Sequence, residues 1–352
     1  MQPRPSRLPR RAIDPVEVLI VDDSAVVRAA LGRILDDTPG MQIAGVCDGA
    51  EKAVAWLRTN RADIVLLDIQ MPGIDGLTAM PALVAAANGA PILIVSSIAA
   101  AGAEATVRAL ALGAADTLEK PRAGQLGANF GELLVERIVK LAQHVGRRAV
   151  EREPVALRAA SAESIGCVAI GASTGGIHAL EAFLTNLPAD FAPPILVTQH
   201  LPPAFVPFFV QQMATRTGRR VRIGSEGLAI APQTITVAPG HAHMGCARRG
   251  TLVQITLHTH QSESRCVPSV DPMFADVASV YGARGVGVVL TGMGRDGFNG
   301  ANDLVRARGT VLVQDSASAT VWGMPGAVAK AGLASRIDTP AALARFISRQ
   351  GS

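Results

Sequence analysis

The chain of 352 residues has no apolar run long enough to span a bilayer, which takes about 20 residues in a helix. Its N-terminus lacks the apolar segment of a secretory signal, so we expect no export. The four cysteines, Cys47, Cys167, Cys246 and Cys266, form no C-x-x-C pair, which argues against a structural zinc site or a dithiol redox motif. Scattered single thiols are typical of a reducing compartment, and we expect the protein in the cytoplasm.

The chain also has little excess charge. Lys and Arg number 33 against 29 Asp and Glu, a formal net charge of +4. No helix-turn-helix pattern with a basic recognition helix is found, so a DNA-binding regulator and any nucleic-acid partner are not expected. Basic residues gather at the start, where residues 1–11 hold Arg4, Arg7, Arg10 and Arg11 and no acid. We interpret residues 1–15 as a disordered, solvated basic arm.

Four short apolar runs in the first part of the chain each end in polar residues. Helix-length segments separate the runs, which is typical of a parallel α/β sheet. The carboxyl ends of parallel strands meet at one edge, so we expect the polar residues to lie together there. The runs and the residues that end them are Val18–Val21 with Asp22 and Asp23, Ile64–Leu67 with Asp68, Pro91–Val95 with Ser96, and Ala115–Glu119 with Lys120.

Three carboxylates close together repel one another unless a cation lies between them. Mg²⁺ prefers carboxylate oxygens, so Asp22, Asp23 and Asp68 predict a magnesium site. Asp68 could then accept a phosphoryl group while the cation and Lys120 offset its charge, and Ser96 could hydrogen-bond a phosphoryl oxygen. The alternative, polar residues that only cap helices, does not account for five of them at matching positions.

Residues 16–141 thus resemble the receiver domain of bacterial two-component response regulators, which has a flavodoxin-like (βα)5 fold. The resemblance implies Asp68 as phospho-acceptor, Asp22 and Asp23 as Mg²⁺ ligands, Ser96 as the switch hydroxyl and Lys120 as the phosphate-contacting lysine. Many receivers carry an aromatic residue three positions before the lysine. This chain has Thr117 there, which argues against an aromatic switch.

Residues 142–163 are rich in Arg, Glu and Ala without an apolar stripe, and we interpret them as a linker before a second domain, 164–350. In that domain the run GASTGG (171–176) lies between a strand-like and a helix-like stretch. A serine in such a glycine-flanked turn is exposed beside backbone N–H groups, which suits a nucleophile. A dinucleotide fingerprint is the alternative, but Ser173 stands where the glycine that admits a pyrophosphate would be.

A nucleophilic serine needs a base, and the base needs a carboxylate to orient it. His200 in TQHLPP (198–203) and Asp296 in LTGMGRDG (290–297) both follow apolar, β-rich runs, so a parallel sheet would bring them to the edge that holds Ser173. Asp271 competes for the acid position, and Asp296 is favoured because its glycines allow a tight turn. The histidine pairs 241/243 and 258/260 lack a third ligand, and we expect local hydrogen bonds there instead of zinc.

The second domain is similar to the catalytic domain of the chemotaxis protein-glutamate methylesterases, the CheB family, over about residues 165–331. That family has a doubly wound, mainly parallel α/β fold. Six of its motifs occur here in order: GASTGG, TQHLPP, VAPGHAHM (237–244), PSVD (268–271), LTGMGRDG and GMP (323–325).

This resemblance implies Ser173 as nucleophile, His200 as general base and Asp296 as the residue that orients it. It also implies an oxyanion hole that includes the Met293 N–H group, with Thr174 near the nucleophile. The order Ser, His, Asp along the chain differs from that of α/β-hydrolases and argues against a generic esterase.

The implied reaction is cofactor-free hydrolysis of glutamate methyl esters on chemoreceptors through an acyl-enzyme, with deamidation of receptor glutamines as a second activity. A chemotaxis histidine kinase would be the phosphodonor, and membrane contact would occur only through receptor arrays. Phosphorylated Asp68 would open a cleft that the unphosphorylated receiver covers. Val267 and Ser316 stand where the family often has charged residues, which could alter the substrate cleft. A non-catalytic signalling scaffold is the alternative, and the retained Ser, His and Asp argue against it.

Overall fold

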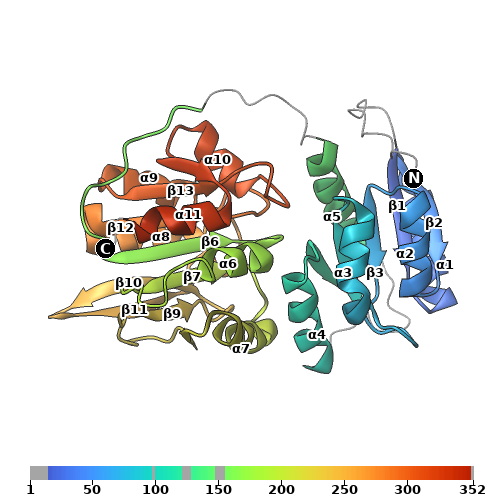
Figure 1. Ribbon diagram of the computed structural model, residues 1–352, viewed down its shortest axis with the longest axis horizontal. Coiled ribbons are helices and arrows are strands. Elements are labelled where there is room, and N and C mark those ends of the chain that lie inside the picture. The colour runs from blue at the N-terminus through green and yellow to red at the C-terminus, as the bar shows by residue number, and fades with distance from the viewer. Residues whose placement is uncertain (1–14, 97–99, 121–127, 147–154, 350–352) are drawn as a thin grey trace. The chain divides into compact units, whose positions relative to one another are not determined.

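The computed structural model describes residues 15–96, 100–120, 128–146 and 155–349. The chain forms two compact units, Met1–Arg152 and Glu153–Ser352, coloured blue to green and green to red in Figure 1. The predicted basic arm lies outside the described residues except for Pro15. None of the described helices has the length and apolarity needed to cross a membrane.

Strands and helices alternate throughout the first unit. The strands form one sheet in the order β2-β1-β3-β4-β5, and every neighbouring pair is parallel. The predicted flavodoxin-like (βα)5 fold is therefore confirmed. The elements are β1 (Val16–Val21), α1 (Ala25–Asp36), β2 (Met41–Cys47), α2 (Ala50–Thr59), β3 (Ile64–Leu67), α3 (Gly76–Ala87), β4 (Ile92–Ser96), α4 (Ala100–Ala111), β5 (Asp116–Glu119) and α5 (Ala128–Gly146).

The sequence pattern did not reveal β2. This strand lies at the sheet edge, and of its seven residues only Cys47 is buried. An edge strand with one open side needs no continuous apolar run. The inner strand β3 is buried along its whole length, as expected where helices cover both faces of a parallel sheet.

The second unit is built around a larger parallel sheet, with the order β14-β13-β12-β6-β7-β9-β8. An antiparallel hairpin, β10 with β11, packs on α8. The elements are β6 (Cys167–Ala172), α6 (Gly176–Leu184), β7 (Ile195–Gln199), η2 (Pro203–Phe205), α7 (Val206–Thr217), β8 (Arg220–Ile223), β9 (Thr234–Val237), β10 (His243–Arg249), β11 (Leu252–His258), α8 (Val270–Tyr281), η3 (Gly282–Arg284), β12 (Gly285–Val289), α9 (Phe298–Arg306), β13 (Thr310–Gln314), α10 (Met324–Lys330), β14 (Arg336–Asp338) and α11 (Pro340–Ser348).

The central strand β6 marks the point where the direction of winding reverses. From β6 the chain passes to β7, then to β8 at the sheet edge and back to β9 between them. It later enters β12 on the other side of β6 and continues outward to β13 and β14. In a doubly wound sheet the loops at such a switch point diverge and leave a crevice at the carboxyl ends of the strands. The loops after β6, β7 and β12 therefore share this edge.

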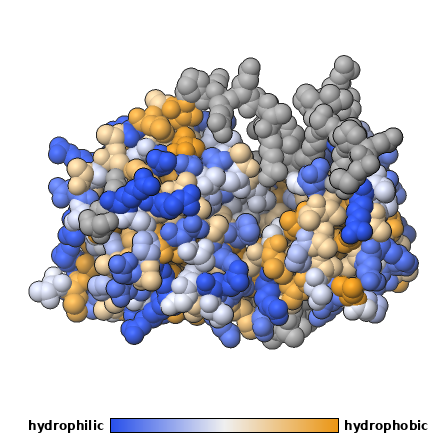
Figure 2. Space-filling view, viewed as in Figure 1, coloured by the Kyte–Doolittle hydropathy of each residue, from blue (hydrophilic) through white to orange (hydrophobic). Residues whose placement is uncertain are grey.

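The core of the second unit lies on both faces of its sheet. Cys167 and Ala169 of β6 join a buried cluster with Phe274 of α8 and Leu304 of α9, and alternate strand residues face the opposite side. There α6 packs against α11. Figure 2 shows hydrophilic residues across the visible surface with hydrophobic ones between them. Single exposed apolar residues of this kind are usual on folded proteins.

The predicted linker, 142–163, is partly built into structured elements. Its start continues α5 to Gly146. Residues 155–163 lie along the second unit, where the Arg158 N–H donates to Ala334 O and the Ser161 N–H donates to Thr310 Oγ1, both at 2.9 Å. Residues 147–154, between these parts, lie outside the described chain.

Candidate active site and acidic pocket

Ser173 lies in a tight turn between β6 and α6. Its N–H donates to Thr291 O at 3.0 Å, and its carbonyl accepts from the Gly176 N–H at 2.7 Å and from Gln199 Nε2 at 2.9 Å. Gly175 has φ of +73°, and a Cβ there would lie 2.3 Å from Thr320 Oγ1. The turn thus needs a residue without a side chain at position 175.

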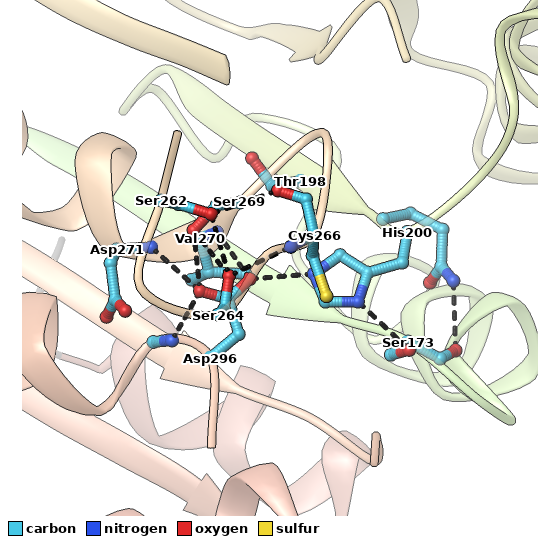
Figure 3. A network of polar contacts seen from close by, with 12 residues as sticks. Ser173, Thr198, His200, Ser262, Ser264, Cys266, Ser269, Val270, Asp271 and Asp296 are labelled. Carbon is cyan, nitrogen blue, oxygen red and sulfur yellow. Dashed lines mark hydrogen bonds and ion pairs between the residues drawn. The ribbon is translucent and has the colours of Figure 1, made fainter. Parts of the chain in front are cut away.

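His200 lies between Ser173 and Asp296, as Figure 3 shows. Its Nδ1 is 3.1 Å from Ser173 Oγ, and its Nε2 is 2.7 Å from Asp296 Oδ2. An ionised carboxylate only accepts hydrogen bonds, so Nε2 carries the ring proton. When the ring is neutral, the Nδ1 lone pair then faces the Ser173 hydroxyl. The three residues predicted to meet at this sheet edge do lie together, and the ring presents Nδ1 to the serine.

The electrostatics of this cluster favour an ion pair between a protonated His200 and an ionised Asp296. Burial lowers the pKa of His200, but Asp296, with a smaller contribution from Cys266, raises it overall to about 9. Burial raises the pKa of Asp296, but the hydrogen bond and charge of His200 bring it below its ordinary value. Asp296 is therefore ionised at neutral pH, although its side chain is only 2% exposed.

Asp296 is held by donors that the sequence did not suggest. The Ser269 hydroxyl donates to Oδ1 at 2.7 Å, and the Val270 N–H donates to Oδ2 at 2.8 Å. Cys266 was also missed as a neighbour of the site. A hydrogen bond with His200 lowers the pKa of its thiol. Ser269 and Cys266 both belong to the loop before α8. The one sequence signal that could have pointed to them was the position of Ser269 in the PSVD motif.

Asp271 does not occupy the acid position. Its carboxylate accepts from the Gly300 N–H at 2.9 Å, at the start of α9, and its backbone N–H donates to Asp296 Oδ1 at 3.3 Å. Burial, with the nearby charge of Asp296, raises the pKa of Asp271 to about 6. The carboxylate against His200 is that of Asp296.

The loop after β12 approaches Ser173 closely at Gly292. A Cβ at Gly292 would lie 2.8 Å from Ser173 Cβ. Among the described residues, the backbone N–H groups of Met293 and Gly294 have no hydrogen-bond acceptor. Thr174 is buried beside the serine, and its carbonyl accepts from Thr291 Oγ1 at 2.9 Å. Free N–H donors next to a nucleophile can stabilise an oxyanion.

The acidic residues of the first unit also converge. Ligand oxygens of Asp22, Asp23 and Asp68 all lie within 4.8 Å of one another. Lys120 Nζ bridges two of them, at 2.7 Å from Asp22 Oδ2 and 2.5 Å from Asp68 Oδ2. Burial raises the pKa of Asp22, although the hydrogen bond from Lys120 opposes the rise. This oxygen-only donor set suits a hard divalent cation such as Mg²⁺.

Two further residues border this pocket. Ser96 is buried at the end of β4, and its carbonyl accepts from the Lys120 N–H at 2.9 Å. Arg28, which the sequence did not single out, donates to the carbonyls of Asp22 and Asp23 at 2.7 and 2.8 Å. The contacts of Arg28 tie the backbone at Asp22 and Asp23 to helix α1.

Comparison with known proteins assigns both units. A family model described as CheB methylesterase matches residues 168–347, and one described as response regulator receiver domain matches residues 18–128. The chain is 30% identical, with a TM-score of 0.52, to the crystal structure of the Thermotoga maritima CheB methylesterase catalytic domain. That match covers 53% of this chain and 99% of the other.

Two curated relatives match almost from end to end. Protein-glutamate methylesterase/protein-glutamine glutaminase 2 of Caulobacter vibrioides is 40% identical over 92% of this chain and 95% of its own length. Protein-glutamate methylesterase/protein-glutamine glutaminase 1 of Paramagnetospirillum magneticum is 36% identical over 94% of each chain. Since both units match in order, this chain belongs to the CheB methylesterase family, with a response regulator receiver domain before the methylesterase domain.

Proposed function

We propose that the protein is a phosphorylation-activated hydrolase that removes methyl groups from glutamate methyl esters of chemoreceptors. The names of its relatives support the reaction, since they describe protein-glutamate methylesterases. The observation that carries the proposal is the hydrogen-bonded series Ser173–His200–Asp296 at the carboxyl edge of the sheet. The three side chains come from loops after three different strands. Their meeting there supports catalysis more strongly than a binding role.

In the proposed mechanism, His200 Nδ1 takes the proton of Ser173 Oγ as this oxygen attacks the ester carbonyl. Asp296 stabilises the imidazolium that forms. The Met293 N–H is the proposed oxyanion donor, with Thr174 beside the nucleophile. The imidazolium returns its proton to the leaving methoxide, and methanol departs. A water molecule, deprotonated by His200, then splits the acyl-enzyme and restores Ser173.

We propose deamidation of receptor glutamines as a second activity of the same site. An amide gives the same kind of tetrahedral intermediate and the same acyl-enzyme, and the imidazolium of His200 would protonate the amide nitrogen so that it leaves as ammonia. The product in both cases is a receptor glutamate.

In the first unit, we propose Asp68 as the phospho-acceptor, with Asp22 and Asp23 as further Mg²⁺ ligands. The bound cation would offset the charge of the phosphoryl group, and Lys120 lies within reach of the same group. Ser96 is the proposed switch hydroxyl. A chemotaxis histidine kinase is the proposed phosphodonor. Phosphorylation turns the carboxylate of Asp68 into a bulkier acyl phosphate with more negative charge, which would relieve inhibition by the receiver.

The proposed site of action is the cytoplasm, on the receptor helices, and four unpaired cysteines are in keeping with that compartment. The test is methanol release from methylated receptor membranes, with and without a small phosphodonor and Mg²⁺. Wild type should release methanol, and more with the phosphodonor, whereas Ser173→Ala should release none. If Ser173→Ala released as much methanol as wild type, Ser173 would not be the nucleophile. If wild type released none even with the phosphodonor, the triad would be idle and the scaffold alternative would take its place.

A further inference from the structure

The buried carboxylate of Asp296 is surrounded by a larger polar cluster than the triad requires. We propose that Ser269 is a positioning residue of the active site. Its hydroxyl, backed by Ser264, keeps Asp296 ionised and in place against His200, and its backbone N–H is held by His243. The proposal rests on the proposed hydrolase function.

The contacts on Asp296 divide between its two oxygens. Oδ2 accepts from His200 and from the Val270 N–H. Oδ1 accepts from the Ser269 hydroxyl at 2.7 Å, the Gly297 N–H at 3.0 Å and the Asp271 N–H at 3.3 Å. Backbone donors are present whatever the side chains are. The side chains of His200 and Ser269 donate to this carboxylate, and the carboxyl of Asp271 also shares a hydrogen bond with it. Donation to an ionised acceptor is stronger than between neutral groups.

The direction of the hydroxyl chain follows from the charge of Asp296. An ionised carboxylate cannot donate, so Ser269 gives its proton to Oδ1. Its oxygen then accepts from Ser264 Oγ at 3.3 Å, and Ser264 Oγ in turn accepts from the Cys266 N–H at 3.3 Å. Figure 3 shows these serines gathered around Asp296, with the His200 ring between them and Ser173. Hydroxyls aligned in this way polarise one another toward the negative charge.

The backbone of Ser269 is held as well. Its N–H donates to His243 Nδ1 at 2.8 Å, and His243 Nε2 is 2.8 Å from His260 O. A carbonyl only accepts, so Nε2 carries the proton and Nδ1 is free to accept from Ser269. Ser269 and His243 are both completely buried. The hydroxyl is therefore aimed at Asp296 before any substrate arrives.

Loss of the Ser269 hydroxyl would have two effects on the site. Oδ1 would keep only two backbone donors, so the carboxylate would be less firmly oriented. Its charge would also be less dispersed and would pair more strongly with the imidazolium of His200. The pKa of His200 should therefore rise, and the acid limb of the pH profile should move to higher pH.

The experiment uses the full chain with phosphodonor, Mg²⁺ and methylated receptor membranes. For Ser269→Ala we expect kcat to fall about tenfold, as for the loss of one hydrogen bond to a charged group, with KM unchanged. Ser264→Ala, one hydroxyl further away, should give a smaller change in the same direction and covers the case in which Ser269→Ala does not fold. Ser318→Ala is the control, because Ser318 Oγ donates to Asp315 Oδ2 over the same 2.7 Å outside this cluster.

A second readout needs no substrate. NMR titration of histidine-labelled protein, with His200 assigned by His200→Gln, should show its pKa higher in Ser269→Ala and unchanged in Ser318→Ala. A variant that is only less stable, but still folded during the titration, would have a lower melting temperature and an unchanged His200 pKa. If wild type turns over and neither serine variant changes kcat or the His200 titration, the positioning role is wrong. If wild type releases no methanol, the proposed function fails, and the titration still decides the role of Ser269.

Discussion

At the scale of single residues, the charge of Asp296 controls the basicity of His200. Burial alone would lower the pKa of this histidine, and the carboxylate more than reverses that effect. Below its pKa the ring is protonated and cannot accept the Ser173 proton. Ester hydrolysis by wild type should therefore increase with pH up to about 9, provided that chemistry limits kcat/KM.

Asp296→Asn should change both the rate and its pH dependence. The amide no longer stabilises an imidazolium, so hydrolysis should fall about 10⁴-fold, the loss seen when a triad acid is neutralised in other enzymes. The pKa of His200 should fall, since burial remains and the charge is gone, so the acid limb moves to lower pH. The check is a pH–rate profile of both proteins. Asp303→Asn on α9, an exposed partner of Arg306, is the control. If the acid limb of the Asp296→Asn profile moved to higher pH instead, the charge of Asp296 would not be what raises the pKa of His200.

At the scale of elements, the turn between β6 and α6 places the nucleophile. Gly175→Ala should destabilise the protein by more than the left-handed backbone alone explains, because the new methyl group would overlap Thr320. The matched control is Gly218→Ala at the end of α7, where φ is +66° and nothing lies within 4 Å of an added Cβ. That control should cost about 1–2 kcal/mol in the free energy of unfolding.

Denaturant unfolding and methanol release measure the two variants side by side. Gly175→Ala should unfold at lower denaturant than Gly218→Ala and should lose most of its turnover, because Ser173 shifts away from His200. Equal unfolding midpoints would mean that the turn relaxes around the added methyl group.

At the scale of the whole molecule, two units with separate chemistry are joined in one chain. A phosphodonor with Mg²⁺ should stimulate methanol release by wild type, and Asp68→Asn should abolish the stimulation while leaving basal release. Removal of Mg²⁺ with a chelator should have the same effect, because the proposed cation site serves the phosphoryl group and not the ester. Asp75→Asn is the control, since asparagine caps helix α3 as well as aspartate does.

A truncated variant tests whether the unphosphorylated receiver inhibits the second unit. The second unit has its own buried core, and a solved relative covers that unit alone. Residues 153–352 should release methanol faster than the unphosphorylated full chain. Equal or slower release would mean that the receiver does not inhibit, and phosphorylation would then have to act by direct activation.

The sequence by itself determined the parallel α/β class, the two-domain order and the residues at the strand ends. This is possible because inner strands must be continuous apolar runs, and in a parallel sheet whatever follows them arrives at one edge. Asp22, Asp68 and Lys120, and likewise Ser173, His200 and Asp296, were predicted to meet on this ground, and in the structure they do. The edge strand β2 was missed because its open side removes the apolar signal.

Only the tertiary structure decided what surrounds these residues. The choice of Asp296 over Asp271 against His200 depends on how the start of α8 packs beside the loop after β12. The donation from Ser269 to Asp296 joins positions 27 residues apart, and the ring nitrogen that faces Ser173 depends on the orientation of one buried side chain. No local pattern encodes such contacts, because each depends on the packing of segments that are distant in the chain.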